Sequence, residues 1–310
     1  VSGTVDTSLA GYAVVSYTIL TSGSYQLSIK INNQPIQDST FTIQISPSST
    51  IDPAGCVGFG SGLSGGTAGV ESMFYVQLVD IYGNNITSGS ATVAGTLIGT
   101  GANTGVQVNG QTKSIGSGVY SISYLPQTSG TYQLQVVVNG GNIAGSPFNA
   151  NVYSANTVSP QNSVAFQLAS EVVAGAINVF LVQPEDPFGN NITVATSINF
   201  LLEFENSDQQ PISNFSYTYQ PANNGLYQIS YNITLSGPFK MFVAMNSSTS
   251  QIEGSPFQIS TQPSSPCAST SVVYGDGLTD ALTDQTETFT IESFDCFDNK
   301  IVVGGGNYTV

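Results

Sequence analysis

The chain has 310 residues, of which 40% are hydrophobic and 7% are charged, and its formal net charge is −15 at pH 7. The apolar content is too high for a disordered chain, and the length allows two to three ordinary domains. Lysine and arginine together number four and histidine is absent; because phosphate recognition depends on basic residues, we expect no nucleic-acid partner.

Residues 1–49 show an alternation of apolar and polar residues that predicts half-buried strands. It is clearest over residues 25–31 and has the period of two expected for a strand with one buried face. We expect Tyr12 to begin the preceding strand and to lie in the core. The interval from Tyr12 to Tyr25 is 13 residues, whereas later copies have 12, so we expect a β-bulge at residues 14–15.

Residues 50–155 hold a complete set of landmarks. The turn sequence Asp-Ile-Tyr-Gly-Asn-Asn-Ile starts at Asp80, alternating strands start at Tyr120 and Tyr132, and a Gly-Ser-Pro-Phe sequence ends at Phe148. The two strands are predicted to pair as a hairpin. The aspartate is predicted to hold its own loop by Asx-turn hydrogen bonds.

Residues 156–262 repeat these landmarks. The aspartate turn recurs at Asp186, the two strands at Tyr227 and Phe239, and Gly-Ser-Pro-Phe ends at Phe257, each 106 to 109 residues after its counterpart. Independent markers that keep one period indicate an internal repeat. The aromatic residues at these equivalent positions are predicted to pack in the core rather than to stack on a ligand.

Residues 263–310 contain only the early landmarks, with a third aspartate turn at Asp295. The densest acidic segment of the chain also lies here, with Asp276, Asp280 and Asp284 spaced four apart. Hard oxygen ligands of this kind suit calcium, but their order is not that of an EF-hand loop, which favours a solvated strand and turn. We expect no metal site and no cofactor.

The run from Gly118 to Phe148, read together with the turn at Asp80, closely resembles a filamin-type immunoglobulin-like repeat. The resemblance covers nearly the whole chain. It implies an all-β fold of tandem antiparallel β-sandwich repeats with a half-repeat at each end. It also implies sheet edges of the kind that receive extended peptides, and a fold that serves cytoskeletal crosslinkers and cell-surface proteins alike. The predicted segments are a late-strand half at 1–49, complete repeats at 50–155 and 156–262, and an early-strand half at 263–310.

The three cysteines are divided between two repeats. Alignment of the repeats places Cys267 in a first strand and Cys296 in the third aspartate turn, and we expect these two to form a disulfide. Cys56 aligns roughly with Cys267 and has no mate in its own domain. It is expected to be a buried thiol, or else to bond a partner outside its domain or on another chain.

Six Asn-X-Ser/Thr sequences without proline at X are candidate N-glycosylation sites, and they favour a secretory route and N-linked glycans. They are Asn85, Asn191, Asn214, Asn232, Asn246 and Asn307. No apolar stretch approaches the length of a membrane span, and the N-terminus has neither an initiator methionine nor a signal-peptide pattern.

Enzymatic chemistry is not expected. Hydrolytic triads and metalloenzymes normally use histidine, which is absent, and nothing in the sequence places two carboxylates across a cleft. We therefore predict a structural subunit of an extracellular, glycosylated filament or surface appendage. Its protomers would join head to tail, each completing a split domain of the next.

Two alternatives stay open at this point. The first is a non-polymeric adhesion ectodomain of tandem repeats, resembling plant and algal gamete-surface proteins. The second is a cytoplasmic actin-linked rod, against which the scarcity of basic residues and the sequons weigh. The half-repeats could equally be a window cut from a longer array.

Overall fold

A computed structural model of the chain describes residues 2–194, 197–304 and 306–309. Strands dominate, and every helix in these residues is a 3₁₀ turn of three or four residues, which confirms the all-β prediction. No helix among them is long and apolar enough to span a membrane. The chain divides into two compact units, residues 1–153 and 154–310.

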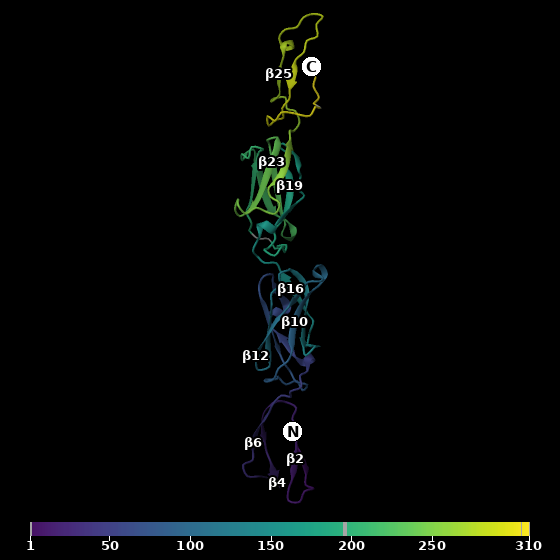
Figure 1. The fold of residues 1–310 in the computed structure, drawn as a ribbon, viewed down its shortest axis with the longest axis vertical. Helices are drawn as coiled ribbons and strands as arrows, with labels where there is room; N and C mark the ends of the chain where they lie inside the picture. Colours follow the sequence, from purple (N-terminus) through teal and green to yellow (C-terminus); the bar gives the residue numbers. More distant parts are fainter. Residues whose placement is uncertain (1, 195–196, 305, 310) are drawn as a thin grey trace. The chain divides into compact units, whose positions relative to one another are not determined.

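The first unit contains a sandwich of two sheets (Figure 1). One sheet has the order β12 (Gln111–Gly116), β13 (Val119–Tyr124), β9 (Ser72–Gln77), β7 (Val57–Phe59). The other has the order β11 (Gln107–Asn109), β10 (Val93–Gly99), β14 (Gly130–Val138), β16 (Phe148–Tyr153), β8 (Gly65–Thr67), and the short β15 (Gly141–Asn142) also pairs with β14. All of these pairs are antiparallel except β8 with β16.

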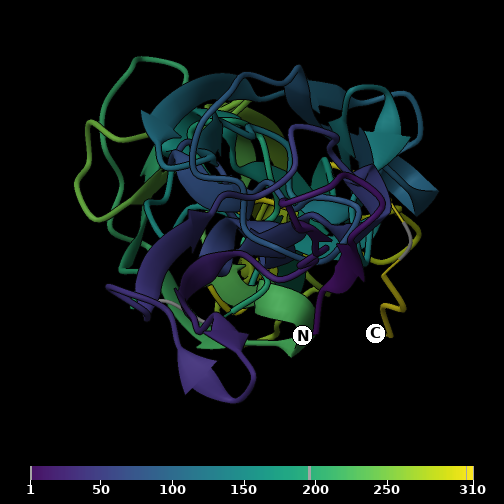
Figure 2. The same ribbon diagram turned by 90° about the horizontal axis from the view of Figure 1, so that it is seen from below.

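The second unit contains a sandwich of the same kind (Figure 1), and Figure 2 shows the whole ribbon from below. Its first sheet has the order β17 (Val164–Phe166), β19 (Asn178–Gln183), β22 (Tyr227–Ile233), β21 (Phe215–Pro221). Its second sheet has the order β18 (Glu171–Val173), β24 (Phe257–Gln262), β23 (Gly237–Met245), β20 (Phe200–Glu205).

The two cores follow from the strand alternation. In the first sandwich Phe74 on β9 and Leu134 on β14 are fully buried within one apolar cluster. In the second, Phe180 on β19 packs edge-on against Tyr231 on β22, with ring centroids 6.0 Å apart. The aromatic residues predicted to lie in the core, Tyr120, Tyr132, Tyr227 and Phe239, are at most 7% exposed. Burial of these apolar faces is the main force that holds the two sheets of each sandwich together.

The predicted hairpin between the strands at Tyr120 and Tyr132 is wrong. β13 pairs with β12 and β9, whereas β14 pairs with β10 and β16. The connection between β13 and β14 therefore crosses from one sheet to the other. The connection between β22 and β23 does the same. The alternation of apolar and polar residues indicates which face of a strand is buried, but it does not indicate which strand lies beside it. The predicted hairpin rested on the closeness of the two strands in the sequence.

The serine of the Gly-Ser-Pro-Phe sequence has a definite role. Its hydroxyl accepts a backbone N–H from the long strand before it, Ser146 from Val136 at 2.8 Å and Ser255 from Val243 at 3.0 Å. Ser39 does the same for Ile29 at 2.9 Å. Residues 38–41, with the sequence Asp-Ser-Thr-Phe, are a degenerate copy of this motif and keep the serine that makes the contact.

In the flanking segments, the described residues form two-stranded sheets. Residues 1–49 contain β1 (Thr4–Asp6) with β2 (Val14–Ser16), β3 (Gly23–Leu27) with β6 (Phe41–Ile45), and β4 (Lys30–Ile31) with β5 (Gln34–Pro35). Residues 263–310 contain β25 (Val272–Tyr274) with β26 (Thr290–Glu292). Many of their apolar side chains are exposed, for example Val15 at 50% and Tyr274 at 54%.

The predictions for Tyr12 are wrong. Its side chain is 70% exposed, and β2 pairs with β1 without a register shift, so the predicted bulge at Val14 and Val15 is absent there. The residue twelve before Tyr25 is Ala13, just as Tyr120 is twelve before Tyr132. An alanine at this position hides the repeat from a search for aromatic residues.

Candidate functional site at the aspartate turns

The three aspartate turns have one geometry. In each, a carboxylate oxygen accepts the backbone N–H groups of the second and fourth residues that follow, at 2.8 to 2.9 Å. The donors are Tyr82 and Asn84 at Asp80, Phe188 and Asn190 at Asp186, and Phe297 and Asn299 at Asp295. This confirms the predicted Asx-turn hydrogen bonds.

The asparagine that ends each turn adds a second layer of contacts. The Asn84 amide nitrogen donates to both carboxylate oxygens of Asp80, at 3.1 and 2.9 Å, and the other two turns have the same pair of bonds. The three aspartates are at most 1% exposed. A buried carboxylate is tolerated here because donors surround it.

The remaining carboxylate oxygen holds the linker that precedes each repeat. It accepts the backbone N–H of Ser48 at 2.7 Å, of Ala155 at 2.8 Å and of Ser264 at 2.8 Å, at Asp80, Asp186 and Asp295 respectively. Desolvation alone would raise the pKa of these carboxyls. The hydrogen bonds from the turn and the linker outweigh it and lower the pKa, in Asp80 to about 2.

This lowered pKa sets an expected pH dependence for the first sandwich. The folded pKa of Asp80 lies below the ordinary value of 3.8, so between the two the unfolded chain binds more protons. We expect the urea midpoint of this sandwich to stay constant from pH 7 to pH 4 and to fall as the pH drops towards 2. A decline between pH 7 and pH 5 would contradict this assignment.

The asparagines of the turns at Asp80 and Asp295 also bond the segment before the linker. The Asn84 amide donates to the carbonyl of Leu20 at 2.8 Å and accepts the N–H of Ser22 at 2.8 Å. Asn299 makes the same two bonds, to Thr234 at 2.7 Å and from Ser236 at 2.7 Å. Residues 20–22 and 234–236 are equivalent turns that precede β3 and β23. This contact was not predicted from the sequence. Its one signal there is the asparagine that stands four residues after the aspartate in each turn.

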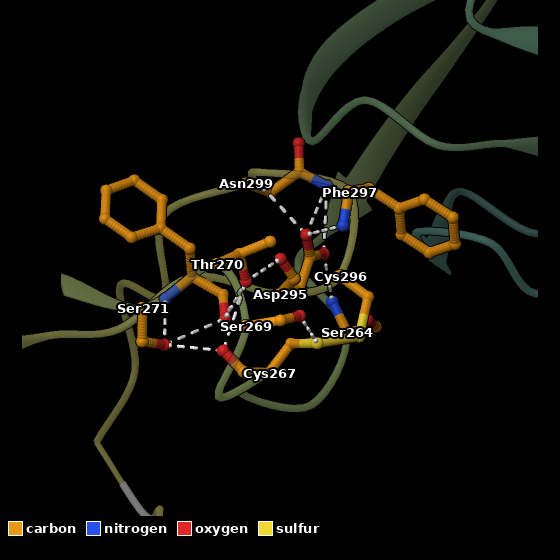
Figure 3. The surroundings of a disulfide bond; sticks show 10 residues. Ser264, Cys267, Ser269, Thr270, Ser271, Asp295, Cys296, Phe297 and Asn299 are labelled. Atoms are coloured by element: carbon orange, nitrogen blue, oxygen red, sulfur yellow. Dashed lines mark hydrogen bonds between the residues drawn. A yellow bond between two sulfur atoms is a disulfide. The ribbon is translucent and has the colours of Figure 1, made fainter.

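The third turn carries a disulfide. Cys267 and Cys296 are bonded, with their Cα atoms 5.1 Å apart (Figure 3), within the usual range for a disulfide. Cys296 lies between Asp295 and Phe297, and the bond therefore ties the aspartate turn to the 3₁₀-like turn at residues 267–271 of the same segment.

Cys56 is buried and takes the place of a serine. Its Sγ lies 3.3 Å from the carbonyl of Asp52 and accepts the N–H of Val79 at 3.4 Å. Two serine hydroxyls make the equivalent bonds in the other copies, at 2.8 to 3.1 Å. The Ser163 hydroxyl donates to the Ser159 carbonyl and accepts the N–H of Glu185. The Ser271 hydroxyl donates to the Cys267 carbonyl and accepts the N–H of Phe294. The predicted alignment of Cys56 with Cys267 is therefore wrong by four residues, and Cys56 is a free thiol.

We expect Cys56→Ser to keep the fold, because serine already occupies this position in the other two copies. The free energy of unfolding should change by about 1 kcal/mol or less. Burial raises the pKa of the Cys56 thiol, so the native chain should react slowly with a thiol reagent and the urea-unfolded chain quickly. A loss of several kcal/mol in the serine variant would show that the two positions are not equivalent.

The predicted glycosylation sites lie mostly on the surface. Asn85, Asn191, Asn214, Asn246 and Asn307 are exposed, whereas Asn232 is half-buried on β22. In the first two aspartate turns the two successive asparagines diverge: Asn84 and Asn190 point into the turn, and Asn85 and Asn191 are left to solvent.

The acidic segment does not converge on one point. Asp276, Asp280 and Asp284 are all exposed, and among the residues that the structure describes, no three His, Cys, Asp or Glu side chains gather closely enough to hold a metal ion.

Two family profiles match the chain. Residues 50–149 match the Filamin/ABP280 repeat, and residues 164–260 match the GEX2 N-terminal Ig-like domain. Filamin-C of Rattus norvegicus is 25% identical over 273 residues, which is 86% of this chain, and Filamin-C of Mus musculus is 24% identical. The chain spans only 9% of the length of either relative.

Among solved structures, the Escherichia coli adhesin FdeC superposes with a TM-score of 0.56 at 17% sequence identity. The match covers 81% of this chain and 77% of that one. At this identity the likeness concerns the fold, and together with the family profiles it confirms tandem immunoglobulin-like sandwiches.

Proposed function

Because this chain belongs to the filamin-type immunoglobulin-like repeat family, we propose that it is a structural array in an extracellular or surface-exposed adhesion protein. In this function, repeats over residues 50–155 and 156–262 are spacers, and the aspartate turns at Asp80 and Asp295 hold the segment that precedes each of them. The array would be held together by strand pairing, by burial of apolar side chains and by hydrogen bonds at the junctions.

The junction contacts are the observation that supports this function best. A flexible linker would leave neighbouring repeats free to rotate, whereas Asn84 and Asn299 each bond the preceding segment twice. Such buried, charge-assisted turns favour a fixed orientation over a loose tether.

An extracellular location is supported by three further features. The Cys267–Cys296 disulfide is typical of oxidising compartments. Five of the six sequons place their asparagine on the surface, and the solved structure with the same fold is an adhesin.

Mass spectrometry of native material tests the location. We expect glycan mass on peptides that contain Asn85 or Asn191, because both side chains project from the aspartate turn. Peptides over both sites that are entirely unmodified would contradict secretion and favour the cytoplasmic rod.

A head-to-tail filament is the second candidate, favoured by the exposed apolar faces of the flanking segments. By their spacing from Tyr25, β2, β3 and β6 correspond to β13, β14 and β16 of the first sandwich. By their spacing from Asp295, β25 and β26 correspond to β7 and β9, which pair with each other, and β9 is the strand that pairs with β13. A second copy could therefore cover Val15 and its neighbours.

A paired-cysteine variant distinguishes the two candidates. Val14 and Thr290 correspond to Ser121 and Tyr75, which are partners between β13 and β9. In a filament, Val14→Cys combined with Thr290→Cys should give a ladder of disulfide-linked oligomers, and either single variant should not. Monomers in all three samples, and isolated particles by electron microscopy, would exclude the filament and leave the array.

A further inference from the structure

We propose that the Cys267–Cys296 disulfide braces a docking face, made of Phe297 and Asn299, which fixes residues 263–310 on the end of the second sandwich. The partner surface is the turn at residues 234–236 together with Gly175. This inference holds whether the chain works as an array or as a filament.

The docking face meets its partner through polar and apolar contacts. Asn299 bonds the Thr234 carbonyl and the Ser236 N–H, both at 2.7 Å. The Phe297 ring lies so close to Gly175 that a Cβ at that position would overlap the ring. Gly175 also has a φ of +79°, which favours glycine, and the two surfaces fit each other in shape as well as in hydrogen bonding.

The disulfide lies directly behind this face (Figure 3). Cys296 lies between the docking residue Phe297 and Asp295, whose carboxylate accepts the backbone N–H groups of Phe297 and Asn299. The same turn is held by the Thr270 hydroxyl, which donates to the Asp295 carbonyl at 2.8 Å. These contacts hold the docking face on the residue 267–271 turn.

The other two aspartate turns lack such a bond and do not need one. The positions that correspond to the cysteine pair are Asp52 with Ile81, and Ser159 with Pro187. Each of these turns is backed by a complete sandwich core, whereas the turn at Asp295 is backed only by the β25–β26 hairpin. The covalent bond restricts the motion of this turn, which has no sandwich core packed behind it.

Amide exchange tests the brace on the full chain. A dithiol reductant supplies two electrons and two protons to the disulfide, giving the thiols of Cys267 and Cys296, and itself becomes a cyclic disulfide. We expect exchange of the Ser236 N–H, which bonds only across the junction to Asn299, to rise at least about tenfold on reduction. The variant Cys267→Ser/Cys296→Ser should give the same rise without reductant.

The junction at Asp80 is the matched control, since Ser22 bonds Asn84 in the same way without a disulfide. Exchange at Ser22 should not respond to reductant. Asn299→Ala should expose Ser236 in both redox states while amides in β23 stay protected. Ser236 exchange that agrees within about twofold between the oxidised and reduced chains would overturn the proposal, as would a Ser236 amide already unprotected in the oxidised chain.

Discussion

Gly118→Ala is expected to lower the free energy of unfolding of the first sandwich by about 3 kcal/mol. Gly118 has a φ of +69°, and a Cβ there would overlap the carbonyl oxygen of Ile86. The backbone cannot retreat, because the Gly118 carbonyl accepts the N–H of Leu78 in the core at 2.9 Å. Urea denaturation, monitored through the hydrogen exchange of the backbone amides in β13 and β14, measures the loss of unfolding free energy.

Gly116 provides a control two residues away. Its φ is +93°, but no heavy atom lies within 4 Å of the position of its Cβ. Gly116→Ala should therefore cost only the strain of a positive φ, about 1 kcal/mol. Equal losses in the two variants would show that the contact with Ile86 is unimportant.

Asp186→Ala should destabilise the second sandwich by about 3 kcal/mol. Removal of the carboxylate leaves the N–H groups of Ala155, Phe188 and Asn190 without their acceptor, and the buried Asn190 amide also loses two bonds. Calorimetry should show the transition of this sandwich at lower temperature.

The neighbouring Asn191 supplies the comparison for this variant. It follows the same turn and its side chain is exposed, so Asn191→Ala should change the free energy of unfolding by less than about 0.5 kcal/mol. An Asp186→Ala chain as stable as Asn191→Ala would mean that water replaces the carboxylate without cost.

Strand identity and repeat period could be predicted from the sequence because both rest on local pattern. The alternation over residues 132–138 gave a strand that the structure has as β14. The local part of the aspartate turn was equally accessible, since the donors to Asp80 lie within four residues of it.

Contacts between distant residues could not be predicted in this way. The choice of strand partners for β13 and β14 depends on how two sheets close over a core, and the bonds from Asn84 to residues 20–22 span more than 60 residues. The counterpart of Cys56 is Ser271 and not Cys267, because a thiol and a hydroxyl can occupy the same position and make the same bonds. Residue type alone therefore indicated the wrong alignment.

The recurrence of one junction geometry bears on how such a chain can change in length. Because Asn84 and Asn299 meet equivalent turns through the same pair of bonds, loss or duplication of one whole repeat would bring together ends that already match. Only a change in steps of the repeat, here 106 to 109 residues, preserves this match. The gene could therefore lengthen or shorten the protein by unequal recombination without evolving a new junction each time.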